Sequence, residues 1–313
     1  MMMSDTEFEP IGIFPALPTP IASDGSINYG ALEEHIQYVE DGGVHGVVPA
    51  GCTGHAATLG DRGSDMFEEH VEFISRVAEM TDLPIIAGDG LNSTRQTIEL
   101  AKKVEKEADI TAHLMISPYQ NCPPQDRIVE HYRKIGEEIE KPIIVYNVPS
   151  RTGLNMEPET TLEIAEEVDR ALGIKEASNN YEQVREIGKA LELRDLESFY
   201  LGSGVDSAND FIFEQGGTFS ISVSANVYPE GVVDVWQAGF EKNDFVGAYE
   251  LNRDLGDLHN AMFQKGEKNP MSVQYALKLL GFDYGVPRPP LDREPLPENR
   301  REIEEVLEDL DLL

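Results

Sequence analysis

The sequence predicts an α/β fold: a closed (β/α)8 TIM barrel with a C-terminal helical extension. Eight short apolar runs rich in β-branched residues alternate along the chain with stretches whose apolar residues recur at the helical period. A chain of 313 residues is also long for one domain unless that domain is an α/β barrel. An open doubly wound sheet is the alternative, but no G-x-G-x-x-G fingerprint follows the first run.

The apolar runs have the length and the composition of buried parallel strands. Val and Ile are frequent in them, and these side chains suit a pleated, buried surface. The expected strands are 11–17, 46–51, 84–88, 112–117, 142–148, 171–177, 197–203 and 219–224. Because a stretch long enough for a helix follows each one, the strands can pair in parallel and close on themselves.

Helices are expected between the strands, because the apolar spacing changes there. Within 67–78, and again within 128–139, apolar residues follow one another at steps of four, three and four. This spacing places them on one face of a helix. Asn92 and Ser93 before TRQTIELAKKV, and Pro158 before TTLEIAEEV, are signals for the start of a helix.

The chain continues after the eighth unit with further amphipathic stretches. Helices are expected at roughly 243–263, 269–280 and 298–311, with the proline-rich linker GVPRPPLDREPLP before the last of them. We therefore expect a barrel over residues 1–240 and, over 241–313, a helical extension packed on the barrel.

The chain is strongly acidic, with 58 Asp and Glu against 25 Lys and Arg, a net charge of -33 and a pI near 4.4. Nucleic acids and anionic membranes bind through neutralisation of phosphate by Lys and Arg, so neither is an expected partner. The acidic residues are spread through all the expected helices instead of forming a tail. A surface of this kind suits a protein that stays dispersed in concentrated salt, which indicates a halophilic host.

Several classes of protein are excluded by what the sequence lacks. No window holds the roughly 18 apolar residues of a membrane span, and MMMSDTEFEP does not have the pattern of a signal peptide. Two cysteines, Cys52 and Cys122, allow neither a disulfide framework nor a four-cysteine zinc site. The seven histidines form no H-x-x-x-H pair, and His113 is expected to pack within the barrel. We expect a cytoplasmic protein without a catalytic metal or a cofactor.

Lys175 is the first candidate for chemistry, because it lies near the end of the sixth expected strand in ALGIKEAS. Active sites of (β/α)8 barrels lie at the carboxyl ends of the strands. One interpretation is a lysine whose stem packs while its ammonium group stays in solvent. The other is a buried amine, whose pKa is lowered by desolvation so that it can attack a carbonyl carbon. The resulting Schiff base would make cleavage or formation of the adjacent C–C bond feasible.

Two further candidates follow the neighbouring fifth strand, in PIIVYNVPSRTG. Tyr146 could meet Lys175 and relay protons, although tyrosine is also common in strand cores. Arg151 lies in the loop just beyond, where it is either a surface charge or a bidentate partner for a carboxylate. Asp89, after the third strand, is a weaker candidate for the mouth of the barrel.

The turn PAGCTGH after the second strand contains three polar or reactive side chains, Cys52, Thr53 and His55. A cysteine near a histidine can be a nucleophile with its base. Gly51 and Gly54 permit a tight turn, whose amides could hold a carboxylate together with the Thr53 hydroxyl. The lysine is the better nucleophile, so we expect the turn to bind substrate.

Taken together, YNVPSRTG, GIKEAS and the G-x-T-G turn resemble the dihydrodipicolinate synthase/N-acetylneuraminate lyase family. The likeness extends over almost the whole chain and includes FPALPTP, IIAGDGLNST, SPYQN, ISVSAN and GVPRPPL. Members of that family are (β/α)8 class I lyases, usually homotetramers, that bind pyruvate or another 2-oxo acid as a lysine Schiff base. The resemblance therefore implies a small 2-oxo acid as substrate.

The resemblance also implies a role for each matching residue. Lys175 would form the Schiff base and Tyr146 would shuttle protons. Thr53 would bind the carboxylate of the 2-oxo acid, and the backbone carbonyl of Ile221 would face the site. Arg151 matches the arginine that binds the carboxylate of the second substrate in the synthases.

The sequence departs from the family pattern at the proton relay. Cys52 stands where the family's Gly-Thr-Thr-Gly-Glu turn has its first threonine, and His55 stands where it has glutamate. Gln120 replaces the second tyrosine of the usual Pro-Tyr-Tyr, which completes the relay from a neighbouring subunit. A thiol is a weak hydrogen-bond donor, and an amide cannot carry a proton as a phenol does. Two of three relay positions are therefore changed.

These departures direct the functional prediction. The main expectation is a lyase that acts on 2-keto-3-deoxy sugar acids by aldol cleavage or dehydration. The first alternative is 4-hydroxy-tetrahydrodipicolinate synthase, which condenses pyruvate with aspartate semialdehyde, and other 2-oxo-acid lyases are also possible. A non-catalytic barrel that keeps the 2-oxo-acid pocket as a sensor is an alternative from a different class.

Overall fold

A curled parallel sheet forms the centre of the computed structural model, which describes residues 8–60 and 67–313. Residues 1–7, on which the expectation about a signal peptide depends, are outside this range. Within the described residues the strand order is β1-β7-β6-β5-β4-β3-β2, with neighbours paired in parallel. The strands are β1 Gly12–Pro15, β2 Ile86–Gly88, β3 Ala112–Ile116, β4 Ile143–Asn147, β5 Ala171–Glu176, β6 Tyr200–Ser203 and β7 Phe219–Ser222.

Residues 47–48 close the sheet into a barrel. Val48 forms a parallel bridge with Ala16, next to β1, and Val47 forms one with Ile85, next to β2. This segment is the expected second strand, so the predicted (β/α)8 barrel is confirmed. It is shorter than the predicted 46–51, because Pro49 has no N–H to donate and Ala50 turns the chain with a φ of 56°.

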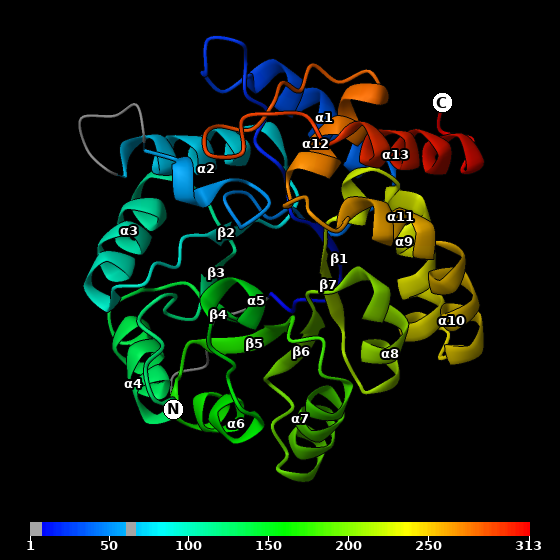
Figure 1. The fold of residues 1–313 in the computed structure, drawn as a ribbon. Helices are drawn as coiled ribbons and strands as arrows, with labels where there is room; N and C mark the ends of the chain where they lie inside the picture. Colours follow the sequence, from blue (N-terminus) through cyan, green and yellow to red (C-terminus); the bar gives the residue numbers. More distant parts are fainter. Residues whose placement is uncertain (1–7, 61–66) are drawn as a thin grey trace.

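The helices surround the barrel, as Figure 1 shows. In chain order they are α1 Tyr29–Asp41, α2 Glu68–Met80, α3 Thr94–Glu107, α4 Gln125–Gly136, α5 Pro149–Thr152, α6 Pro158–Glu167, α7 Tyr181–Leu193, α8 Asn209–Glu214 and α9 Pro229–Trp236. The expected helix starts are confirmed, since Ser93 is the N-cap residue of α3 and Pro158 is the first residue of α6. The short α5 adds one turn directly after β4.

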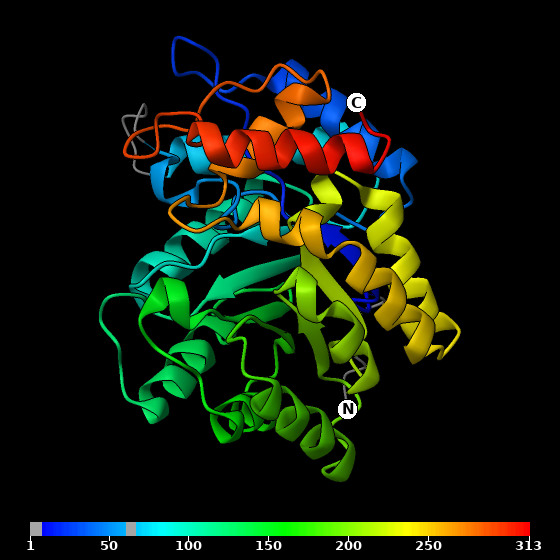
Figure 2. The ribbon, with the colours of Figure 1, turned by 45° about the vertical axis from the view of Figure 1, so that its right-hand side comes forward.

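Four more helices form the C-terminal extension: α10 Phe245–Asp254, α11 Gly256–Met262, α12 Met271–Leu279 and α13 Pro297–Asp309. The single helix expected over 243–263 is broken at Leu255, next to Gly256, a poor helix former. In Figure 2, α13 lies across one end of the barrel as the red helix. Side chains of α11, α12 and α13 share a buried apolar cluster with Val223 and Val227, which follow β7. The domain boundary near 240 stays a prediction.

Two apolar layers hold the barrel together. One fills the space between the strands and the helices, and the other fills the interior of the barrel. Phe14 and Phe219 meet edge to face in the interior, with ring centroids 6.4 Å apart. This interior layer includes Tyr146 and Ala177, which lie near the carboxyl ends of β4 and β5. The packed interior therefore extends to the end of the barrel at which Lys175 lies.

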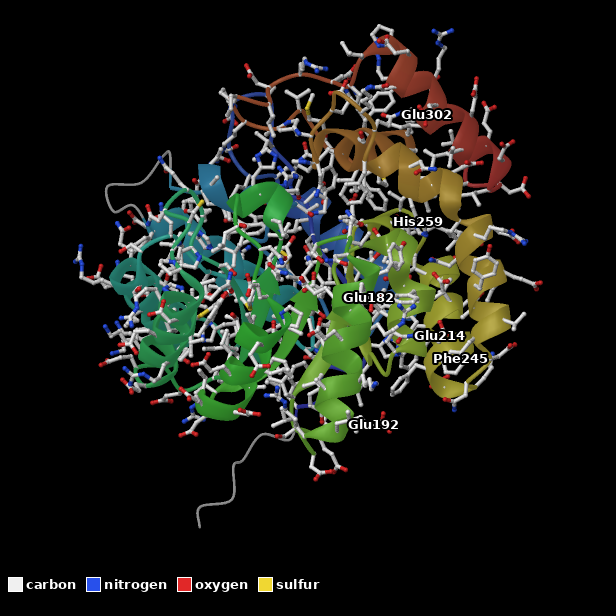
Figure 3. All side chains as sticks on the ribbon, turned by 60° about the horizontal axis from the view of Figure 1, so that its bottom comes forward. Glu182, Glu192, Glu214, Phe245, His259 and Glu302 are labelled. Atoms are coloured by element: carbon white, nitrogen blue, oxygen red, sulfur yellow. The ribbon has the colours of Figure 1, made fainter. Side chains whose placement is uncertain are left out.

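The surface is acidic on several sides. Glu182 and Glu192 on α7, Glu214 on α8 and Glu302 on α13 are exposed (Figure 3). Among the described residues, no helix combines the length and the apolar character that crossing a membrane requires. The same residues contain no group of three or more His, Cys, Asp or Glu side chains placed to hold a metal ion.

A buried charged triad links β2, β3 and α3. His113 Nδ1 lies 2.6 Å from Asp89 Oδ2, and His113 Nε2 lies 3.1 Å from Glu105 Oε1. Burial by itself lowers the pKa of His113, but the charges and hydrogen bonds of Asp89 and Glu105 outweigh it and raise the pKa to about 9. Asp89 is therefore committed to a buried ion pair, and it lines neither of the two cavities described below.

This triad predicts a specific pH dependence of stability. The pKa of His113 is raised from 6.5 to about 9 in the folded protein. The stabilisation of the fold by protonated His113 is therefore fully present below pH 6.5 and is lost as the pH rises through 9. The free energy of unfolding of wild type minus that of His113→Gln should therefore fall by about 3 kcal/mol across this window, as measured by urea denaturation.

His131 provides the matched control. Burial lowers its pKa to about 4. The free energy of unfolding of wild type minus that of His131→Gln should therefore stay constant above pH 6.5 and fall as the pH decreases below 6.5. A flat profile for His113→Gln between pH 6.5 and 9.5 would contradict the charged triad.

Candidate active site

A cavity of about 540 Å³ opens at the carboxyl ends of the strands. Lys175 of β5 and Tyr146 of β4 line it, together with the segment 263–269 between α11 and α12. Tyr146 and Lys175 occupy paired positions of the parallel ladder, so their side chains leave the sheet on the same side. Lys175 Nζ lies 4.3 Å from the centroid of the Tyr146 ring. The predicted meeting of the two residues is confirmed.

Lys175 is buried, with an exposed fraction of 5%. Gly204, after β6, makes room for it, because a Cβ atom there would lie 2.9 Å from Lys175 Cε. Burial lowers the pKa of Lys175 to about 8, although the charges of Cys52 and Asp206 act in the opposite direction. The interpretation in which the ammonium group reaches solvent is therefore wrong. A larger share of the amine is neutral near pH 7 than in an exposed lysine, as nucleophilic attack requires.

Tyr146 is held in its protonated form. Burial raises its pKa well above the usual value, and so do the charge of Cys52 and a hydrogen bond with that residue, while Arg151 acts in the opposite direction. A protonated phenol beside the amine can donate a hydrogen bond to an oxygen of a bound ligand. Cys52 is half-buried and lines the same cavity as Tyr146 and Lys175, and the relay position of its thiol stays a prediction.

Thr53 faces the same cavity from the turn after residues 47–48. Its Oγ1 accepts a hydrogen bond of 2.8 Å from Asn269 Nδ2, and the residue is 3% exposed. Because this oxygen already accepts from Asn269, its own proton is available for a ligand in the cavity. Gly54 is needed behind it, since a Cβ there would lie 2.9 Å from the backbone of Ala50 and of Leu17.

His55 closes the turn in the left-handed conformation, with a φ of 61°. Burial, followed by the charge of Arg288, lowers its pKa to about 4, so the imidazole is neutral at neutral pH. Its Nδ1 lies 3.4 Å from Thr58 Oγ1, which makes only a weak contact. His55 lines a second, mainly apolar cavity of about 480 Å³ that shares Cys52, Tyr146 and Asn269 with the first.

Arg151 stands at the rim of the site. It is an exposed residue of α5 that lines both cavities, and its Nη2 donates a hydrogen bond of 3.2 Å to the carbonyl of Asn269. A guanidinium in this position can reach a carboxylate that projects from the cavity.

Neither Ile221 nor Gln120 lines the 540 Å³ cavity. The Ile221 side chain packs inside the barrel and does not line the 540 Å³ cavity, which Val223 does. The role of the Ile221 carbonyl stays a prediction. Gln120 turns the chain with a φ of 66°, and its N–H bonds to the carbonyl of Thr152, so it belongs to the loop against α5.

Two residues of the site were missed by the sequence analysis. Asp206 is buried at the cavity wall, where it accepts hydrogen bonds from Ser222 Oγ at 2.5 Å and from two backbone N–H groups. Its position three residues after a predicted strand was a usable signal. Asn269 gave none, because it lies in the extension and reaches the site only through the tertiary fold.

Comparison with known proteins agrees with this geometry. Residues 9–310 match the model of the dihydrodipicolinate synthetase family. The chain is 40% identical over 302 residues to the 4-hydroxy-tetrahydrodipicolinate synthase of Archaeoglobus fulgidus, covering 96% of this chain and 99% of that one. The corresponding protein of Natronomonas pharaonis is 39% identical, with 96% and 97% covered.

Solved structures lead to the same family. The dihydrodipicolinate synthase of Thermotoga maritima superposes with a TM-score of 0.90 at 32% identity, covering 97% of this chain and 99% of that chain. A second structure titled dihydrodipicolinate synthase has a TM-score of 0.87 at 36% identity, with 97% and 100% covered. With Lys175 buried beside Tyr146, the chain belongs to the dihydrodipicolinate synthetase family and is an enzyme of the class I, Schiff-base lyase kind.

Proposed function

We propose that this enzyme is a 4-hydroxy-tetrahydrodipicolinate synthase, which condenses pyruvate with aspartate semialdehyde. The observation that carries the proposal is the buried amine of Lys175 beside the protonated phenol of Tyr146. The names of the relatives support the synthase over the sugar-acid lyase that was the main expectation from the sequence.

In the first step, the neutral amine of Lys175 attacks C2 of pyruvate. An N–C bond forms, the ketone oxygen is protonated and leaves as water, and a protonated imine remains. The Tyr146 hydroxyl is placed to protonate that oxygen, because burial keeps the phenol in its acid form. The Thr53 hydroxyl and the amides of its turn hold the pyruvate carboxylate.

In the second step, C3 of the imine loses a proton and the resulting enamine attacks the aldehyde carbon of the semialdehyde. The Tyr146 phenolate left by the first step takes up the C3 proton, a C–C bond forms, and the restored phenol donates a proton to the aldehyde oxygen. Arg151 at the rim binds the carboxylate of the semialdehyde in this scheme. The amino group of the new chain then attacks C2, which closes the ring, releases Lys175 as the neutral amine and returns a proton to the Tyr146 phenolate.

A sugar-acid aldolase or dehydratase is the second candidate, and Cys52 is the observation that favours it. The thiol lines the same cavity as Tyr146, and it is a weaker hydrogen-bond donor than the hydroxyl that the family's relay has at this position. The imine step on Lys175 is common to both candidates. They differ only in which bond of the bound 2-oxo acid is made or broken afterwards.

We also propose that the enzyme works as a homotetramer in the cytoplasm of a cell with a salt-rich interior. The family resemblance supports the oligomer, and the net charge of -33 supports the salt. Self-repulsion of such a charge is screened by salt.

The nucleophile is tested by trapping. Incubation with pyruvate and borohydride should give a reduced adduct on Lys175, identified by peptide mass analysis. The Lys175→Ala variant should lose the adduct and all turnover. Lys268→Ala is the matched control, since Lys268 also lines the cavity but is exposed, and it should keep the adduct. If the wild-type enzyme carries no reduced adduct on Lys175, the Schiff-base mechanism is wrong. The non-catalytic barrel that binds a 2-oxo acid as a sensor would then be the remaining interpretation.

The choice of reaction is tested at Cys52. If the enzyme is a synthase, Cys52→Thr should raise kcat for condensation roughly two- to tenfold, a small part of what general acid–base catalysis contributes, and Cys52→Ala should lower it. Pyruvate release from 2-keto-3-deoxygluconate and dehydration of a 2-keto-3-deoxypentonate are measured in parallel. Strong sugar-acid turnover with inert semialdehyde would reject the synthase.

The proposed salt adaptation and assembly are tested together. From dilute buffer to molar KCl, the melting temperature should rise and the mass by light scattering should become that of a tetramer. A melting temperature that falls with salt would reject halophilic adaptation, and a monomer at every salt concentration would reject the tetramer.

A further inference from the structure

A buried ion pair ties the C-terminal extension to the segment that follows the Thr53 turn. Arg288 lies between α12 and α13, and Glu69 lies in the first turn of α2. Arg288 Nη2 lies 2.6 Å from Glu69 Oε1, and Nη1 lies 2.7 Å from Oε2. The two side chains are 6% and 12% exposed. This is the two-point geometry that only a guanidinium can make with a carboxylate.

The same two side chains fix the backbone of 58–60. Arg288 Nη1 donates a hydrogen bond of 2.9 Å to the carbonyl of Thr58, and Glu69 Oε2 accepts one of 2.8 Å from the N–H of Gly60. Arg288 also donates to the carbonyl of Gly25, on the loop after β1. The ion pair therefore fixes the position of the short helix Ala56–Thr58 relative to the barrel.

That short helix is coupled to Thr53 through the backbone. The N–H of Thr58 bonds to the carbonyl of His55 at 2.8 Å, and the N–H of Ala56 bonds to the carbonyl of Gly51 at 3.3 Å. His55 holds a left-handed φ between them, a conformation that persists only where the surroundings enforce it. The charge of Arg288 also contributes to keeping His55 neutral. Backbone hydrogen bonds thus connect Thr58 to the turn that contains Thr53.

We propose that Arg288 and Glu69 are positioning residues for recognition of the substrate carboxylate. They hold the turn so that the Thr53 hydroxyl and the turn amides meet the carboxylate of the 2-oxo acid, while the reactivity of Lys175 does not depend on them. The inference rests on the proposed function, in which Thr53 binds that carboxylate. It makes the C-terminal extension part of the substrate site and not only a cover for the barrel.

The test separates carboxylate recognition from amine reactivity. Borohydride trapping on Lys175 is measured with pyruvate over a range of concentrations and, separately, with acetone, which has the ketone but no carboxylate. In Arg288→Lys, which keeps the charge but loses the fork, the pyruvate concentration for half-maximal trapping should rise roughly tenfold, the equivalent of about 1.4 kcal/mol. The rate with acetone should stay within about twofold of wild type.

Arg194→Lys is the matched control. Arg194 pairs with Glu159 and Glu166 between α6 and α7 and does not touch the turn, so both trapping reactions should be unchanged. The double variant Arg288→Gln/Glu69→Gln removes both charges and leaves neither one buried alone. It should show the same selective loss, and it serves as the test if Arg288→Lys does not fold.

Four outcomes would decide against the proposal. Equal losses with pyruvate and acetone in a folded variant would make Arg288 a merely structural residue. Unchanged trapping in both variants, or failure of both to fold, would show that the pair has no separable role in recognition. If wild type itself gives no pyruvate adduct, the proposed function fails as well. Trapping of wild type with pyruvate tests this independently of the variants.

Discussion

Burial of one lysine amine at the end of a packed barrel is the constraint on which the site depends. An ammonium group loses hydration when it is buried, so the fold stabilises the neutral amine relative to the charged form, and the pKa of Lys175 falls to about 8. That burial requires rigid neighbours. The Gly204 backbone packs against the lysine stem, and the paired ladder positions of Lys175 and Tyr146 set the distance from amine to phenol.

The same burial acts in opposite directions on the two partners. It lowers the pKa of the amine and raises that of the phenol. Near neutral pH this leaves more of the base free to attack and keeps the acid able to donate. A nucleophile and a proton donor thus arise from one buried environment. Cys52 lines the same cavity, and we propose that its weak strength as a hydrogen-bond donor influences which second substrate the enzyme uses.

The turn that we propose binds the carboxylate, in contrast, is held by distant parts of the chain. Asn269 bonds to Thr53 across 216 positions, and Arg288 bonds to Thr58 across 230. Both come from the extension, so the barrel supplies the chemical groups while the extension holds the turn that faces them. This division explains why a helical extension is packed over the carboxyl ends of the strands, where it lines the cavity through 263–269.

The sequence by itself determined the barrel and the reactive pair. Strand and helix periodicities are local, and neighbouring parallel strands must bring Tyr146 and Lys175 to the same edge. The exact ends of some strands and helices differed from the prediction. Pro49 and Ala50 shortened the second strand to two bridged residues, and Leu255 split one predicted helix into two. Asp206 could have been found from its place after a strand, because that signal is also local.

Only the tertiary structure decided the rest. Whether Lys175 is buried or reaches solvent depends on what packs over it, and its apolar neighbours in ALGIKEAS are compatible with both interpretations. Asp89 was a candidate for the barrel mouth, yet His113 and Glu105 hold it in a buried triad. Asn269 lies in no motif, and Arg288 lies in GVPRPPL, which indicated the family but gave no role for the arginine. Their roles come from contacts more than two hundred residues apart along the chain, which no local pattern encodes.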